Sequence, residues 1–404
     1  MRVGNLIFLI WIVLSFVLHA QQQENTLFEI LKGNSPAVDS VLAKHEQFKV
    51  QILFSRVNRG EDGVTINTHS LYLDSTRYFN PASTVKLPAA LLSLEKINNL
   101  AIPGLTKYSR LEIDSSYKGQ KPYRFDPTAK DSIASIAQFI KRIFVVSDNE
   151  SYSRLYEFLG RDSLNIGLWN KGFTDTKILQ RFTGGFDYET NKYTNGFTFY
   201  NAQGNVVYKQ APQYSAPNWE NQKQDMFQGT GHYAGDDTTV TPTPFDFTRR
   251  NFFSLQNMHS MLIALFFPDQ AAPSMRFNLS EDDRVFLREV MSMLPRESKY
   301  PKYQPYEDYP DGFVKFAMYG DVNDSIPDNI NIYNKIGLAF GYVIENAYIV
   351  DEKNGIEFFV SAVAHSNADG IMNDGIYEYD TVLLPFLGNL GRVLYDYEVK
   401  NLKK

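Results

Sequence analysis

Cysteine is absent from the 404 residues of the chain, which excludes a disulfide framework and a lipid anchor on cysteine. Basic blocks are also absent, and the formal net charge of −6 argues against a nucleic-acid partner. The six histidines show no metal-ligand spacing, and no phosphate-binding glycine loop or G-x-S-x-G elbow is present, so we expect neither a metal nor a cofactor. Stability must then come from a hydrophobic core, for which 43% hydrophobic residues suffice.

One long hydrophobic run occurs, from Leu6 to Leu18, and it ends at His19-Ala20-Gln21. It is short for a transmembrane span and is followed by a small residue, as in a secretory signal peptide. We therefore expect residues 1–20 to be cleaved and the protein to be exported, to the periplasm or outside the cell. An uncleaved anchor is the alternative. After cleavage, no membrane-spanning candidate remains.

The stretch from Phe79 to Leu92 passes from an Asn-Pro turn through a polar patch into an apolar run. Within it, Ser83 and Lys86 would lie on one face of a helix that begins here. A partly desolvated lysine loses its proton readily and can then accept the serine proton. The spacing predicts a nucleophile and its base, with a capped helix and a solvated lysine as the alternative. Pro88 lies rather deep for a helix capped at Ser83, so we expect a kinked or tightened first turn.

The same spacing recurs at Ser115 and Lys118. That second copy lies in a polar stretch rich in tyrosine and glycine, with no apolar run behind it to bury the lysine. We therefore expect Ser83, and not Ser115, to be the nucleophile.

Hydrophobic periodicity predicts an N-terminal β-hairpin, several helices and a C-terminal strand group. The hairpin comprises a strand over 48–54 and a return strand from 64. Helices are expected over 132–144, 150–159, 252–266, 280–293 and 379–397, and strands over 332–337, 341–350 and 356–364.

Residues 184–250 differ in composition, being rich in Gly, Asn, Tyr, Gln, Thr and Pro. They contain one credible hairpin, 197–200 returning as 206–208. We interpret the segment as an insertion that lies over the surface or a cleft, without a core of its own, within a single domain over 21–404. Its aromatic residues are expected to serve in packing, with a glycan or peptidoglycan platform as the alternative.

Two further motifs follow Ser83-x-x-Lys86 in the chain. Ser147-Asp148-Asn149 lies on a loop between helices, where a plain capping turn is the alternative interpretation. Lys335-Ile336-Gly337 lies on a strand that begins a meander. In this order and context, the three motifs resemble those of the serine β-lactamase and penicillin-binding-protein superfamily, in particular its class A-like branch.

The resemblance implies catalytic roles for four residues. Ser83 would be the acylated nucleophile, and Lys86 would be its base or proton relay. Ser147 would pass a proton towards the leaving nitrogen. Lys335 would supply positive charge to a substrate carboxylate and to Ser147.

The resemblance also implies a substrate-binding strand and an oxyanion hole. Asn149 would bond the amide side chain of the substrate, and the backbone N–H groups of Ser83 and Leu338 would bind the oxyanion. Ile336, Gly337 and Leu338 would line the site. Ile336 departs from the family pattern, which has a hydroxyl there that helps to hold the substrate carboxylate.

A second departure concerns deacylation. Where the class A pattern has a glutamate in a loop after the S-D-N helix, Arg181-Phe182 is followed here by Thr183. A threonine hydroxyl cannot act as a general base near neutral pH. Asp187 and Glu189 lie only nearby in the sequence, after a Gly184-Gly185 pair that leaves their placement open, so Thr183, Asp187 and Glu189 are weak candidates. We therefore expect intact acylation and slow hydrolysis of the acyl-enzyme.

The sequence thus predicts an α+β fold, with an antiparallel sheet flanked by terminal helices and a mostly helical half between Ser83 and about Ile326. The implied function is that of a monomeric serine acyl hydrolase that opens β-lactam rings through an acyl-serine. A cell-wall D,D-peptidase-like or other amide hydrolase, acting on a peptidoglycan-type amide, is one alternative. A non-catalytic binding member of the superfamily is the other.

Overall fold

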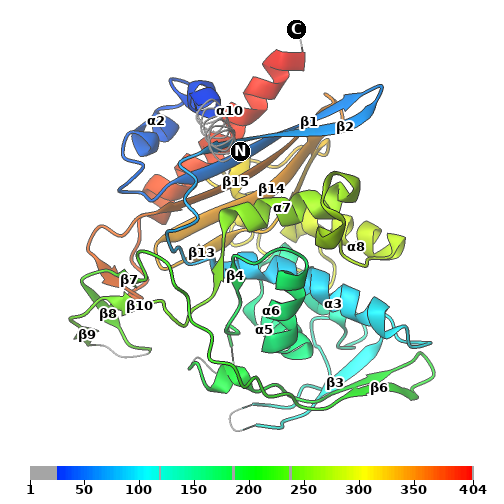
Figure 1. Ribbon diagram of the computed structural model, residues 1–404. Helices are drawn as coiled ribbons and strands as arrows, with labels where there is room; N and C mark the ends of the chain where they lie inside the picture. Colours follow the sequence, from blue (N-terminus) through cyan, green and yellow to red (C-terminus); the bar gives the residue numbers. More distant parts are fainter. Residues whose placement is uncertain (1–24, 118–119, 184–186, 236–238, 403–404) are drawn as a thin grey trace, which may run out of the picture.

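The computed structural model describes residues 25–117, 120–183, 187–235 and 239–402 (Figure 1). The expected signal peptide over 1–20 lies outside these residues, as does Lys118 of the second S-x-x-K copy. Within the described ranges, no helix has both the length and the apolar character needed to cross a membrane.

The principal sheet is antiparallel, with strand order β12-β14-β15-β1-β2 and with β13 also paired to β14. Its strands are β1 (Gln51–Gly60), β2 (Gly63–Leu71), β12 (Ile330–Asn334), β13 (Gly337–Ala339), β14 (Tyr342–Asp351) and β15 (Ile356–His365). The N-terminal hairpin therefore lies beside a strand from the C-terminal part of the chain. Together with its segregated helices, this sheet confirms the predicted α+β class.

Side chains alternate across the two faces of this sheet, as the pleat requires. On β15, Phe359 and Val363 join the core shared with the helical half, whereas Phe358 and Val360 join a second core. That second core lies under α2 (Pro36–Leu42) and α10 (Leu384–Leu402), while α7 (Leu255–Phe266) covers the opposite face (Figure 1). Both faces are thus buried, which explains the nearly continuous apolar sequence of β14 and β15.

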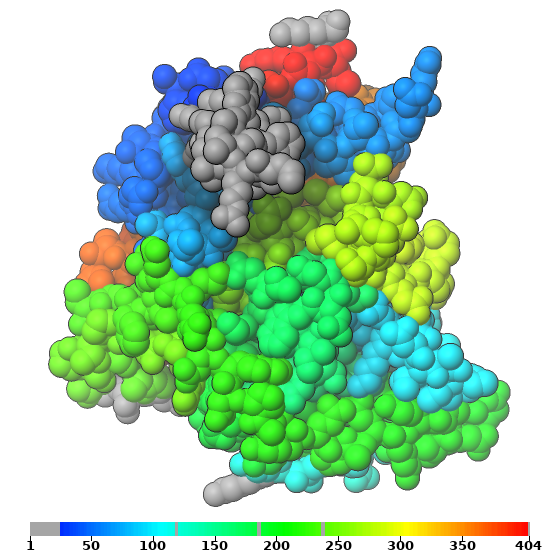
Figure 2. Space-filling view, in the orientation of Figure 1, coloured from blue at the N-terminus to red at the C-terminus, as the bar shows by residue number. Residues whose placement is uncertain are grey.

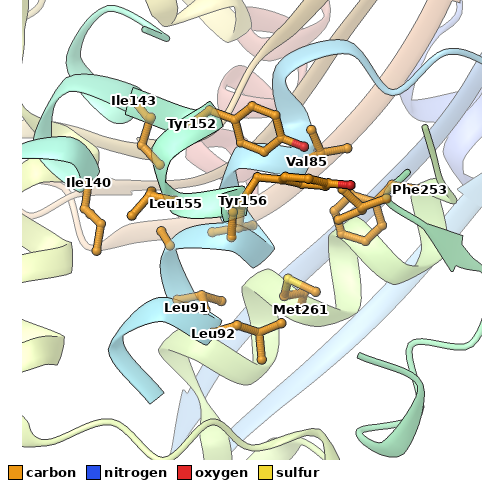
Figure 3. Close-up of a cluster of buried hydrophobic side chains, with 14 of the residues drawn as sticks. Val85, Leu91, Leu92, Ile140, Ile143, Tyr152, Leu155, Tyr156, Phe253 and Met261 are labelled. Atoms are coloured by element: carbon orange, nitrogen blue, oxygen red, sulfur yellow. The ribbon is translucent and has the colours of Figure 1, made fainter. Parts of the chain in front are cut away.

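The helical half packs onto the sheet through α7. Its helices are α3 (Lys86–Leu100), α4 (Ile136–Val145), α5 (Asn149–Leu159), α6 (Arg161–Asn170) and α8 (Glu281–Ser292). Figure 3 shows Leu91 of α3, Ile143 of α4 and Leu155 of α5 in one buried cluster with Met261 of α7. The helix that carries Lys86 is therefore fixed in the centre of the larger core.

Two strands of the insertion pair with strands outside it. Its predicted hairpin is present as β5 (Phe197–Tyr200) and β6 (Val206–Gln210), and β5 also pairs with β3 (Arg110–Ile113) outside the insertion. Further along, β8 (Gly231–Tyr233) runs parallel to β16 (Ile371–Met372). Phe197 and Phe199 belong to the same core as α3, so this segment shares the main core. On the surface, the green atoms of the insertion adjoin the teal and cyan atoms of the helical half (Figure 2).

The described chain also contains several short strands and one short helix. They are β4 (Thr176–Lys177), β7 (Phe227–Gln228), β9 (Val240–Thr241), β10 (Phe245–Asp246), β11 (Phe252–Phe253) and α9 (Phe316–Tyr319).

Candidate active site

Ser83 lies in a 3₁₀ turn, Ala82–Val85, that leads directly into α3. The α-helix begins at Lys86, so Pro88 is its third residue, where a missing N–H leaves no intrahelical bond unmade. The tightened first turn that Pro88 requires is thus present. Ser83 opens this helical stretch without capping it, because no side chain caps the 3₁₀ turn or the start of α3.

Lys86 is completely buried, and its amine contacts four oxygen atoms. Nζ lies 2.8 Å from Ser83 Oγ, 3.1 Å from Ser147 Oγ and 2.7 Å from Asn149 Oδ1, and it also contacts the Ser147 carbonyl oxygen. A neutral amine has two N–H donors, and the two carbonyl-type oxygens can accept both of them. The lone pair then remains available for the proton of a serine hydroxyl.

The electrostatic surroundings of Lys86 favour this neutral amine. Burial lowers the pKa of Lys86 well below its ordinary value, and the nearby charge of Lys335 lowers it further, while Asp148 acts in the opposite direction. Both dominant effects disfavour the ammonium form. Lys86 is therefore suited to accept a proton near neutral pH.

Ser147 is held in a left-handed backbone conformation, with φ of +56°. For a residue with a side chain this costs roughly 1–3 kcal/mol, so the surrounding turn must stabilise it. Asp148 does so by capping α5, accepting a 2.7 Å hydrogen bond from the Ser151 N–H, and by pairing with Arg142 at 3.0 Å. The result is that both oxygens of Ser147 contact Lys86.

Lys335 reaches Ser147 from the other side. Its Nζ donates hydrogen bonds to Ser147 Oγ at 2.9 Å and to the Ile336 carbonyl at 3.0 Å. Burial lowers the pKa of Lys335 to about 7, with Glu345 opposing this shift and Lys315 adding to it. The side chain is 1% exposed and lines neither of the cavities described below, so its position favours an action on Ser147 over contact with a substrate carboxylate.

Two cavities, of about 600 and 680 Å³, meet at Ser83, Asn149 and Leu338. The first, which we call the insertion cavity, is bordered by the loop after β4 and by the end of the insertion. Its lining includes Gln180, Phe182, His232, Phe245, Arg250 and Phe340. The second, the acidic cavity, is lined by Ser147 and Ile336 and by four carboxylates, Glu307, Asp308, Asp321 and Asp380. The chemistry at Ser83 is thus flanked by surfaces of different charge.

The three deacylation candidates lie outside both linings. The Thr183 N–H donates to Ser153 Oγ at 3.0 Å, Asp187 Oδ1 accepts from the Thr190 N–H, and Glu189 pairs with a neighbouring lysine at 2.9 Å. Phe182 instead lines the insertion cavity, with its ring centre 5.3 Å from Lys86 Nζ. An aromatic ring therefore occupies the approach to the lysine on this side.

The loop that carries Phe182 is fixed by contacts between residues that lie far apart in the sequence. Arg181 and Glu157 form an ion pair in which both side chains are buried. Asn251 Oδ1 accepts hydrogen bonds from the N–H groups of Leu179 and Gln180 at 2.7 and 3.0 Å. These partners are far apart in the sequence, so local spacing gives no signal for them.

Several solved β-lactamases are similar to this chain at low identity. One from Desulfarculus baarsii DSM 2075 has 12% identity over 90% of this chain and 97% of its own, with a TM-score of 0.49. One from Streptosporangium roseum has 15% identity over 89% and 98%, with a TM-score of 0.48, and an ancestral class A β-lactamase has 13% over 89% and 99%, also at 0.48.

Among curated protein sequences, none matches this chain significantly. The sequence model of the β-lactamase enzyme family, in contrast, matches residues 35–276, a span that includes Ser83, Lys86 and Ser147. This match covers more than half of the chain and confirms the resemblance to β-lactamases, so the protein belongs to the β-lactamase enzyme family.

Proposed function

We propose that the protein is a serine acyl hydrolase of β-lactamase type in which Ser83 forms an acyl-serine intermediate. One observation carries the proposal: the buried Lys86 amine lies within hydrogen-bonding distance of both Ser83 Oγ and Ser147 Oγ, at 2.8 and 3.1 Å. Membership of the β-lactamase family supports the same chemistry.

The acylation step follows from this geometry. The neutral amine of Lys86 takes the proton of Ser83 as Oγ attacks the amide carbonyl carbon, and the carbonyl oxygen becomes an oxyanion. The N–H groups of Ser83 and Leu338 stabilise that charge. The C–N bond then breaks, and the nitrogen takes a proton from Ser147 Oγ, which recovers one from Lys86. Lys335 holds Ser147 in place for this transfer.

Deacylation requires a base that activates water against the ester. Thr183, Asp187 and Glu189 lie outside the lining of both cavities, and the ring of Phe182 borders Lys86. Loss of a positioned general base typically costs a factor of about 10² to 10⁴ in rate, and none of these three candidates lines either cavity. We therefore propose that the acyl-enzyme accumulates.

Time-resolved mass spectrometry with benzylpenicillin tests both steps. We expect rapid gain of the mass of the whole β-lactam on the peptide that contains Ser83, followed by slow loss. Ser83→Ala should show no adduct, whereas the matched control Ser115→Ala should label normally. Labelling of Ser83→Ala would overturn the assignment, and turnover without an accumulating adduct would overturn slow deacylation.

A D,D-peptidase-like or other amide hydrolase is the second candidate. The acidic cavity and Ile336 favour an amide whose leaving group carries no carboxylate, because these surroundings would repel a carboxylate that lies next to the scissile bond. Release of an amine from a peptide amide, faster than release of product from benzylpenicillin, would identify this activity.

We also propose that residues 1–20 direct export and that the mature protein is a single-domain monomer with an insertion over 184–250. N-terminal sequencing should begin at Gln21. Sedimentation should give the mass of one chain.

A further inference from the structure

We infer that Arg250 is a specificity-determining residue that binds a carboxylate on the acyl side of the substrate, in the insertion cavity. The acyl side is assigned because Ser147, which protonates the leaving nitrogen, lines the acidic cavity and not the insertion cavity. The leaving group therefore lies towards the acidic cavity, and the acyl group lies towards Arg250. The covalent part of this inference rests on the proposed function.

Arg250 is partly buried and lacks a carboxylate partner within 4.0 Å among the described residues. Its Nη1 donates to Gln180 Oε1 at 3.3 Å, and its guanidinium lies 5.0 Å from the centre of the Phe245 ring. The preceding residue, Arg249, shows the contrast, because it pairs with Glu220 at 2.9 Å on the exposed surface. Arg250 thus retains donors that a ligand can use.

Burial of Arg250 disfavours its charge. Desolvation lowers the pKa of Arg250, and only Tyr78 and Asp246 oppose this at a distance. A bound carboxylate would compensate the charge through two parallel N–H···O bonds, which the planar guanidinium is shaped to form.

The rest of the insertion cavity fits an aromatic or apolar acyl group with an acidic substituent. Phe182, Phe245 and Phe340 supply apolar walls, and no carboxylate occurs among its described lining residues. Its other arginine, Arg181, is already paired with Glu157.

The acidic cavity has the opposite character. Neither lysine nor arginine occurs among its described lining residues, and of its four carboxylates only Asp321 is paired, with Arg392 at 2.6 Å. A substrate carboxylate placed there would meet Glu307, Asp308 and Asp380. The two cavities together therefore orient an anionic acyl group towards Arg250.

The first test compares two penicillins that share a nucleus and differ by one carboxylate, with benzyl and α-carboxybenzyl side chains. We expect Ser83 to be acylated at least about tenfold faster by the carboxylated compound, because its extra carboxylate can form a charge-assisted pair with the Arg250 guanidinium. Arg250→Gln should reduce the ratio to about one, Arg250→Lys should retain part of it, and the control Arg249→Gln should leave it unchanged. Equal ratios in Arg250→Gln and the parent enzyme would overturn the inference.

A second test does not depend on chemistry. In the Ser83→Ala background, phenylacetate should raise the melting temperature and phenylacetamide should not. Arg250→Gln should abolish the phenylacetate effect, whereas Arg249→Gln should retain it. If neither penicillin labels Ser83, the proposed function fails while this readout still decides the role of Arg250. Should Arg250→Gln fail to fold, retention of phenylacetate binding in Arg250→Lys supports the inference, and its full loss overturns it.

Discussion

The backbone of Gly337 passes so close to Pro81 that a β-carbon at position 337 would lie 2.8 Å from the Pro81 carbonyl oxygen. The same β-carbon would lie 3.1 Å from Cβ of Ala82. Because Gly337 has no side chain, strand β13 can lie directly against the 3₁₀ turn that contains Ser83. This contact brings the strand of Leu338 next to the nucleophile.

Gly337→Ala should therefore separate the two proposed oxyanion donors. We expect acylation to slow by about 100-fold, the usual effect of losing one such donor. Gly60→Ala is a matched control, because its β-carbon would approach no atom closer than 3.9 Å. Acylation by benzylpenicillin, measured for both variants, gives the comparison. An unchanged rate in Gly337→Ala would show that the close approach has no role in catalysis.

Acylation should depend on pH through two lysines. The rate should rise with pH as Lys86 loses its proton, at a pKa well below that of a free lysine, and should fall as Lys335 loses its charge at about pH 7. Glu345 raises the pKa of Lys335, so Glu345→Gln should move the falling limb to lower pH. Lys315 lowers that pKa, so Lys315→Met should move the limb to higher pH. A falling limb that stays in place in both variants would exclude Lys335 as its source.

Stability should depend on pH through Lys315, which lines neither cavity. Burial lowers its pKa to about 7, against 10.5 for the ordinary side chain. Between pH 7 and pH 10.5, Lys315 is protonated in the unfolded chain and neutral in the folded protein. The free energy of unfolding should therefore rise with pH over this range. Below pH 7 the side chain is protonated in both states, so it contributes no pH dependence there. One pH unit corresponds to about 1.4 kcal/mol for one proton.

Urea unfolding at pH 7 and pH 9 measures this contribution. Lys315→Met also loses hydrogen bonds to the Ile332 carbonyl and to Asn334 Oδ1, which lowers stability at both pH values. The informative quantity is the difference between the two pH values. It should be about 2 kcal/mol smaller in the variant. Identical differences would mean that Lys315 is not neutralised by folding.

His259 should stabilise the interface between α7 and the sheet. Its ring nitrogens lie 2.6 Å from Ser55 Oγ and 2.7 Å from Ser361 Oγ, and burial lowers its pKa to about 3. His259→Leu should cost about 1–3 kcal/mol at neutral pH, because two buried hydroxyls each lose a partner. The parent protein should also lose stability as pH falls from 6.5 towards 3, since only its unfolded chain then binds the proton. Calorimetry at pH 4 and pH 6.5 should show a smaller difference in the variant.

The parts of the site that could be predicted from the sequence are those set by local spacing. Ser83 lies in the 3₁₀ turn, and Lys86 is the first residue of the α-helix that follows it. Ser147 and Asp148 form the turn before α5, which begins at Asn149. Such contacts depend on backbone geometry within a few residues. The burial of Lys335 could not be predicted this way, because it depends on the neighbouring strand that carries Glu345.

Parts of the fold were missed for similar reasons. Gly160 ends α5, and helix α6 begins at the next residue. A glycine at the end of one helix does not indicate that another helix follows at once, so α6 was not predicted. Strand β5 pairs with β3, which lies far from it in the sequence. The residues of neither strand indicate which other strand it pairs with. Arg250 and Phe182 likewise line one cavity only because the insertion returns to the loop after β4.

The strand order of the principal sheet also determines when the protein can fold during synthesis. Strand β1 pairs with β15 from Gln51↔Val363 to Arg56↔Phe358. The N-terminal strand can therefore form this pairing only after β15 has been synthesised, near the end of translation. Until then the hairpin β1–β2 presents an open edge, and such edges promote association between chains. A message truncated before codon 356 would yield a chain that keeps Ser83 and Lys86 but leaves this edge permanently unpaired. Aggregation, not weak activity, is the outcome to expect from such fragments.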